Sequence, residues 1–373
     1  MLTVAPDDVH RGGDGADRAD GADRADARPS APPTARRVLL RRSWSRGGGL
    51  VILLVALGGV AVCSLAFGSK PIPFRTVLDA LFSFDPTSND HLIVRSLRGP
   101  RAVTGLMVGV ALGLSGAVMQ GVARNPLADP GILGVEAGAA LFVVIGIHAF
   151  GVATLLGYVW FAFVGAAIAS VVVYVLGSLG REGATPVKLA LAGAAMTAFL
   201  GSITTAILLL DVSTLDQFRF WNVGSLAGRD GTIAAQMAPF IIAGTFLALL
   251  SGRSLNALAL GDDVARSLGQ RVGWSRVLSA TAVVVLVGAA TAAAGPIAFV
   301  GLTVPHVARV MTGPDYRWVL PYSAALAPIL LLGSDVIGRV VARPGELQVG
   351  IVTALIGSPF FVILVRRRKL AEL

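Results

Sequence analysis

The feature that most constrains this chain is a series of long apolar stretches that contain no Asp, Glu, Lys or Arg. A helix needs about 20 apolar residues to cross the hydrocarbon layer of a bilayer. Because the stretches are continuous rather than alternating, they predict membrane helices and not a β-barrel. They cover residues 50–69, 102–123, 137–180, 189–210, 232–252, 277–305, 318–334 and 347–365.

Two of these stretches are long enough for two crossings each. One contains a break near Phe150 and Gly151, and the other, which extends to Arg309, is broken at Gly295 and Pro296. The length criterion therefore predicts about ten transmembrane helices. We expect an all-α, polytopic membrane protein whose transmembrane domain covers residues 38–373. Residues 1–37 have almost no apolar side chains to bury, so we expect a disordered tail.

Basic residues indicate the orientation of the predicted helices. An arginine cluster precedes the first span, and Arg366 to Lys369 follow the last. The loops on the side of both termini hold roughly twice as many basic residues as the loops on the other side. Both termini are therefore expected in the cytoplasm, and the formal charge of +9 calls for no nucleic-acid partner. The longest loop expected on that side covers residues 252–276.

Several kinds of chemistry are excluded by what the sequence lacks. The single cysteine, Cys63, allows no internal disulfide and no thiolate metal site. There is no G-x-x-x-x-G-K-[ST] phosphate loop for a nucleotide. Glu136 and Asp335 fall at the ends of predicted spans, whereas ion-driven carriers usually keep such residues in mid-membrane. We predict no catalytic residue, no metal ligand and no bound cofactor, and we expect His306 to pack or cap a helix.

A polar turn between two apolar stretches supplies further candidate residues. Exposed backbone groups find no partners in lipid, so this turn must cap a pair of helices or pack among them. Its candidate structural residues are Arg124, Asn125, Pro126, Leu127 and Pro130.

The loop at residues 252–276 contains a short predicted helix. Asp262 and Asp263 suit a helix N-terminus, and Gly269 suits the stop. Val264, Ala265 and Leu268 form a small apolar face. This pattern fits either a helix lying in the membrane interface or a helix that docks a cytoplasmic partner.

Arginines also occur on the side where the positive-inside rule disfavours them. Arg98 and Arg101 are expected to open the second span, and Arg339 and Arg343 lie between the last two. One interpretation is pairing within the protein, because Asp335 and Arg339 are spaced to meet on one helix turn. The other is a basic rim that docks an acidic partner.

Small residues predict close helix packing, with a pathway or a dimer contact as the alternative. They include Gly109, Gly113, Ser115, Gly116, Gly165 and Gly193. The chain also has two similar halves, because a small-residue helix followed by a Gly/Pro-interrupted segment occurs in each. Paired interruptions of this kind are typical of transporter repeats, and five spans per half would make the second copy inverted.

Several motifs together resemble the FecCD family, the permeases of bacterial ABC importers for iron–siderophores, haem and cobalamin. The polar turn resembles a family signature, and the stretch G-x-I-x-F-V-G-L-x-x-P-H-x-x-R resembles another. Trp221, otherwise expected as an anchor at the membrane interface, begins a W-x-x-G-S-L pattern. Two positions depart from the family: Gly99 replaces leucine in R-x-P-R, and Gln348 replaces proline in E-[IL]-P-V-G. The second signature matches at Gly295, Ile297, Phe299, Val300, Gly301, Leu302, Pro305, His306 and Arg309.

The resemblance implies a permease subunit with a type II fold that binds no cofactor and catalyses no reaction. Two copies of a separate ATPase would use ATP and Mg²⁺, a second permease would complete the pore, and an extracytoplasmic binding protein would deliver the cargo. An iron–siderophore is the expected cargo, with haem or cobalamin as alternatives and a self-contained secondary transporter as a different class. The binding protein would engage Arg98, Arg101 and Arg339. The ATPase would contact Gly261, Asp263, Ala265, Leu268 and Gly269.

Overall fold

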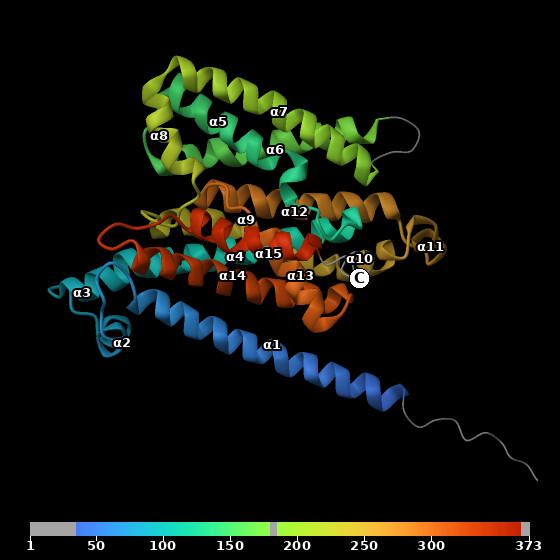
Figure 1. The fold of residues 1–373 in the computed structure, drawn as a ribbon, viewed down its shortest axis with the longest axis horizontal. Coiled ribbons are helices and arrows are strands. Elements are labelled where there is room, and N and C mark those ends of the chain that lie inside the picture. Colours follow the sequence, from blue (N-terminus) through green and yellow to red (C-terminus); the bar gives the residue numbers. More distant parts are fainter. Residues whose placement is uncertain (1–34, 180–184, 367–373) are drawn as a thin grey trace, which may run out of the picture. The chain divides into compact units, whose positions relative to one another are not determined.

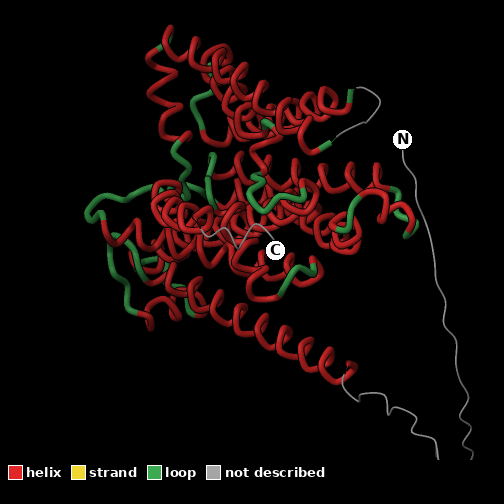
Figure 2. Tube along the Cα trace, turned by 45° about the vertical axis from the view of Figure 1, so that its right-hand side comes forward, coloured by secondary structure: helices red, strands yellow, loops and turns green. Residues whose placement is uncertain are grey.

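A computed structural model describes residues 35–179 and 185–366 of the chain. The chain divides into two compact units, residues 1–44 and 45–373, and the helical body discussed below is the second. Most of the predicted tail lies outside the described residues. Nearly all of the described chain is helical, and the connections are short (Figure 2).

Fifteen α-helices follow one another in the described residues (Figure 1). The first eight are α1 (Ala35–Ala66), α2 (Phe74–Phe82), α3 (Asn89–Leu92), α4 (Gly99–Ala123), α5 (Val135–Phe150), α6 (Leu155–Ser178), α7 (Pro186–Leu210) and α8 (Val212–Asn222). The others are α9 (Gly231–Leu250), α10 (Gly252–Ala259), α11 (Asp262–Ser267), α12 (Val272–Ala294), α13 (Val300–Thr312), α14 (Tyr316–Val341) and α15 (Val349–Arg366).

Seven helices of the described chain are long and apolar enough to cross a membrane, and shorter apolar helices accompany them. The long ones lie within Arg46–Ala66, Asn89–Ala123, Leu155–Ser178, Val187–Leu210, Gly231–Leu250, Val272–Ala294 and Tyr316–Val341. The shorter ones are Val135–Phe150 and Val349–Ile363. The all-helical membrane architecture expected from the apolar stretches is therefore confirmed.

Both predicted breaks are confirmed. α5 ends at Phe150, and Gly151 caps it with a left-handed φ of 64°. α12 ends before Gly295, and α13 begins at Val300. The start of the second span was predicted wrongly, because a π-helical segment, Ile93–Arg98, joins α3 to α4 without interruption. Arg98 and Arg101 therefore lie inside a continuous helix of 35 residues rather than at its beginning.

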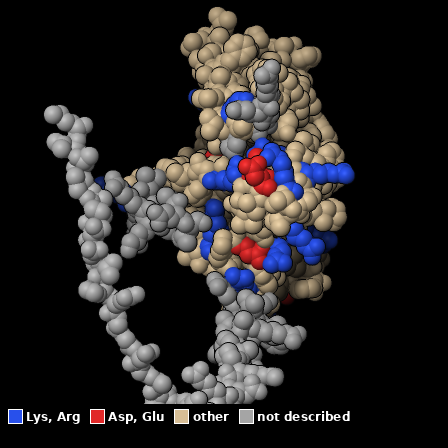
Figure 3. All heavy atoms as spheres, turned by 90° about the vertical axis from the view of Figure 1, so that its right-hand side faces the viewer, with Lys and Arg blue, Asp and Glu red and all other residues tan. Residues whose placement is uncertain are grey.

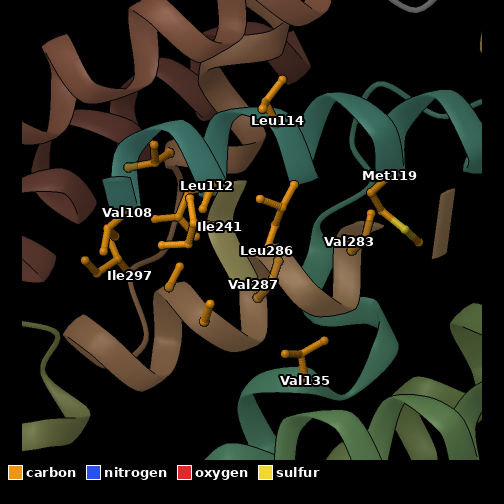
Figure 4. Close-up of a cluster of buried hydrophobic side chains, with 14 of the residues drawn as sticks. Val108, Leu112, Leu114, Met119, Val135, Ile241, Val283, Leu286, Val287 and Ile297 are labelled. Atoms are coloured by element: carbon orange, nitrogen blue, oxygen red, sulfur yellow. The ribbon is translucent and has the colours of Figure 1, made fainter. Parts of the chain in front are cut away.

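The centre of the helical body is α4, which packs against α14, α12, α13 and α9. Most of its apolar length is buried, whereas α1 and α7 are largely exposed. Figure 4 shows the core between α4 and α12, with residues from α5 and α9 beside it. The labelled side chains include Leu112 and Met119 of α4, Val135 of α5, Ile241 of α9 and Leu286 of α12.

Glycines allow the helices to approach to backbone contact. A Cβ atom at Gly116 of α4 would overlap the backbone of Gly301 in α13, and one at Gly165 of α6 would overlap the carbonyl of Gly138 in α5. Gly193 of α7 lies equally close to the backbone just before α5. These contacts are the close packing that the small residues predict.

Candidate functional site: an arginine pocket and a docking segment

The three arginines predicted to receive a binding protein lie together, and all three are buried. Arg98 is 6% exposed, Arg101 9% and Arg339 2%. Arg101 and Arg339 share the carboxylate of Asp335 at 2.7 Å and 3.0 Å. Arg101 also binds Glu346 at 2.7 Å. The pairing of Asp335 with Arg339 on one helix turn, expected as one interpretation, is confirmed.

A second set of hydrogen bonds joins arginines to the C-terminal end of α1. Arg98, Arg339 and Arg343 donate their guanidinium N–H groups to backbone carbonyls there. The last carbonyls of a helix have no intrahelical partner, and positive groups stabilise a helix C-terminus. The arginines therefore fix α1 to α4 and α14. The acceptors are the carbonyls of Ser64, Leu65, Ala66, Gly68 and Lys70.

Arg98, Arg101 and Arg339 line a pocket of about 400 Å³. Lys70 also lines the pocket. Its side chain is 58% exposed and forms an ion pair with Asp90. Arg229 is 6% exposed and donates to the carbonyl of Ser225 at 3.1 Å. Five cations and two carboxylates line the pocket, so it favours acidic groups. We call it the arginine pocket; its charged lining is Lys70, Arg98, Arg101, Arg229, Arg339, Asp230 and Glu346.

Segments with family motifs meet at the break between α12 and α13. The amide of Gly350 donates to the carbonyl of Gly224 at 3.1 Å. A Cβ atom at Gly295 would overlap the carbonyl of Trp221. Trp221 is 2% exposed and packs on Phe218 with ring centroids 5.8 Å apart. The expectation that this tryptophan anchors at the membrane interface is therefore wrong, because its ring faces the protein interior.

The polar turn after α4 is held by its own side chains, and the last turn of α4 before it is joined to α13. The amide of Leu127 donates to Asn125 Oδ1 at 2.9 Å. Gln120 donates to the carbonyl of Leu302 at 3.1 Å and accepts a hydrogen bond from Arg309. These two hydrogen bonds therefore join the end of α4 to α13 just before the polar turn.

His306 packs inside the protein, and the prolines of the two signature stretches differ in burial. The ring of His306 is 6% exposed and lies edge-on to Phe360, with centroids 6.2 Å apart. Pro305 is buried within α13, and Pro130 is buried after the polar turn, while Pro126 is partly exposed. Among the described residues, no group of three or more His, Cys, Asp or Glu side chains is placed to hold a metal ion.

A short exposed segment lies at the far end of the helical body from α2 and α3 (Figure 1). Gly261 and Gly269 flank α11 with positive φ angles of 103° and 80°, which suit glycine. The Asp263 side chain is 99% exposed, and Leu268 is 63% exposed. Ala265 is fully buried, so the predicted apolar face is divided between the interior and the surface. We call residues 261–269 the docking segment.

Polar contacts tie the docking segment and α10 to the membrane helices. Asp262 binds Arg276 of α12 at 2.8 Å and Arg124, after α4, at 3.3 Å. In α10, Asn256 donates to Asp315 at 2.6 Å. Burial raises the pKa of Asp315, but hydrogen bonds from Arg317 and Asn256 outweigh it and lower the value to about 2. Figure 3, which faces this end, shows basic side chains gathered around acidic ones.

Sequence reasoning missed the acidic partners of the arginines. The fold shows that Asp262 and Glu346 bind arginines and that Asp335 binds Arg101 as well as Arg339. The contact between Asp335 and Arg101 could not be predicted, because the two residues are 234 positions apart in the sequence. Their local signal is weak, since a single carboxylate near a predicted span end has many possible partners. The arginine spacing alone does not reveal which carboxylate each arginine binds.

Comparisons with known proteins decide the class. A profile of the FecCD transport family matches residues 52–367. The chain belongs to the FecCD transport family. It is 46% identical over 332 residues to the ferric enterobactin transport system permease protein FepD of Escherichia coli, covering 89% of this chain and 97% of FepD. The Fe(3+)-citrate import system permease protein YfmD of Bacillus subtilis is 44% identical, covering 88% of this chain and 97% of YfmD.

The fold is also similar to a solved structure of a metal-chelate type ABC transporter in an inward-facing conformation. The TM-score is 0.76 at 27% identity, and the match covers 86% of this chain and 99% of that one. This FecCD chain is a multi-pass permease of the bacterial inner membrane and part of an ABC importer complex. It is a non-catalytic subunit, and a partner ATPase uses the ATP.

Proposed function

We propose that this FecCD permease carries a ferric chelate, an iron–siderophore, into the cytoplasm. The observation that carries the proposal is the close sequence match along nearly the whole chain to permeases named for ferric chelates. The protein would work as half of a pore, with a second copy or a related chain as the other half. Haem or cobalamin is the alternative cargo within the family.

The proposed topology has ten spans in two inverted five-helix repeats, with both termini in the cytoplasm. The seven long apolar helices would be joined by the shorter α5, α13 and α15. In this arrangement the docking segment lies on the cytoplasmic side, and the arginine pocket faces outward. The basic residues that precede the first span and surround α11 support this orientation.

Each end of the helical body would then receive its own partner. The exposed Asp263 and Leu268 would contact one of two ATPase subunits. The arginine pocket would receive acidic side chains of the binding protein. Because Arg98, Arg101 and Arg339 are mostly buried and paired, they would act by giving the pocket its positive charge as well as by direct contact.

Reconstitution in lipid vesicles tests the proposal. We expect accumulation of a radiolabelled ferric siderophore only when the permease, its ATPase, its binding protein and Mg-ATP are all present. Uptake against a gradient by the permease alone would instead identify a secondary transporter. Uptake of haem or cobalamin but not of the ferric siderophore, with the complete complex, would correct the cargo and keep the transport class.

A further inference from the structure

Two neighbouring aspartates of the docking segment have different surroundings. Asp263 is 99% exposed and pairs with Arg266 of its own helix, at 2.8 Å. Asp262 points the other way and is 23% exposed. It binds Arg276 through both carboxylate oxygens, at 2.8 Å and 3.1 Å, and Arg124 at 3.3 Å. One aspartate therefore faces solvent, and the other joins α11 to two membrane helices.

The backbone of Arg124 points to the same link. Arg124 caps α4 in the left-handed region, with φ 49° and ψ 33°. Glycine is the usual residue in such a cap, because a Cβ atom strains the backbone there. Glycine could not supply the guanidinium that reaches Asp262. An arginine kept in a conformation suited to glycine suggests a task for its side chain.

The linked helices lie at the centre of the helical body. α4 is the central helix of the body, and α12 packs directly against it. The carboxylate of Asp262 therefore connects α11 to both helices through charge-assisted hydrogen bonds.

We propose that Asp262, with Arg124 and Arg276, is the positioning link that transmits movement of the ATPase from the docking segment to α4 and α12. This inference rests on the proposed function, because it assumes that the ATPase grips α11. Asp262 does not contact the ATPase in this scheme. It holds α11 to the helices that the ATPase moves.

The link contributes more to coupling than to folding. The Asp262 and Arg124 side chains are 23% and 37% exposed, so water can solvate the charges left when this ion pair is broken. Loss of the link should therefore leave the fold intact and weaken the connection between ATP hydrolysis and transport. Coupling between two sites in a protein typically amounts to a factor of about 5–150.

The test uses the complete transporter in vesicles with Asp262→Asn, and separately with Arg124→Gly. Glycine suits the left-handed cap, so Arg124→Gly removes the guanidinium without straining the backbone. We expect both variants to retain the ATPase subunit and their thermal midpoint, and to lose about fivefold in cargo moved per ATP hydrolysed. Asp262→Glu and Arg124→Lys keep the charges. These two variants should therefore move nearly as much cargo per ATP hydrolysed as the wild-type protein does.

The matched control is Asp216→Asn. Asp216 pairs with Arg219 on α8 at 3.2 Å, far from the docking segment, and is 56% exposed. The Asp216→Asn variant should leave the amount of cargo moved per ATP hydrolysed unchanged. The link is refuted if wild-type protein couples hydrolysis to transport and the two variants couple equally well. Loss of the ATPase subunit from Asp262→Asn would make Asp262 a docking contact, which also overturns the inference. A wild-type complex without coupling would mean that the proposed function itself has failed.

Discussion

At the scale of single residues, the decisive contact is between Gly116 of α4 and Gly301 of α13. The two helices touch there through backbone atoms, because neither residue has a side chain. Lipid tails are as apolar as the helices, so close packing of this kind is a main source of helix association in a membrane. The position tolerates no added atom without a shift of one helix.

Gly116→Ala should therefore separate α4 from α13. A Cβ atom at this position would overlap the Gly301 backbone, and overpacking of this kind costs about 1–3 kcal/mol. We expect a lower thermal midpoint in detergent and reduced transport in vesicles. Gly58→Ala is the matched control, because a Cβ atom at Gly58 of α1 has no neighbour within 4 Å. Equal midpoints for both variants would contradict the packing role.

At the scale of elements, the docking segment is small enough to test with two substitutions. Asp263→Arg and Leu268→Glu change exposed side chains and leave the buried Ala265 in place. We expect each to reduce ATPase activity stimulated by the binding protein about tenfold or more, because central interface residues contribute about 2 kcal/mol or more. The measurement is phosphate release by the reconstituted complex.

Each variant has a control elsewhere in the described chain. Asp216→Arg reverses an exposed aspartate that also pairs three residues along its helix. Leu215→Glu changes a leucine of α8 that is 40% exposed and lies outside both the docking segment and the arginine pocket. Wild-type stimulation in both docking variants, or an equal loss in the controls, would remove the docking segment from its proposed role.

The same elements show what sequence could predict. The break after Phe150, the break at Gly295 and the glycine stop at Gly269 were predictable, because each follows from local backbone chemistry. The burial of Trp221 and the partners of Asp262 were not, because they depend on which helices pack together. Sequence patterns therefore predicted the elements well, whereas the ion pairs of the candidate site required the fold.

At the scale of the whole molecule, the arginine pocket should act as an electrostatic funnel for the binding protein. Lys70→Glu changes the charge of the pocket by two units without removing a buried partner. Charge reversal at Arg98 and Arg101 changes it further. We expect weaker capture of the binding protein, with a smaller dependence on ionic strength, because screening acts on the attraction between the partners.

The measurement is the Kd of the binding protein for the permease complex across a salt series. Thermal midpoints of the same variants separate a folding defect from a docking defect, since Arg101 also holds Asp335 and Glu346. An unaltered Kd and salt slope in Lys70→Glu and in the arginine variants would exclude a docking role for this pocket.

The hydrogen bonds at the end of α1 have a consequence for biosynthesis. The carbonyls of Ser64 and Leu65 are made early in translation, yet their donors Arg339 and Arg98 belong to α14 and to the helix that runs into α4. The carbonyl of Ser64 therefore lacks its arginine donor until α14 has emerged from the ribosome. Assembly of the N-terminal segment is completed only when translation is almost finished.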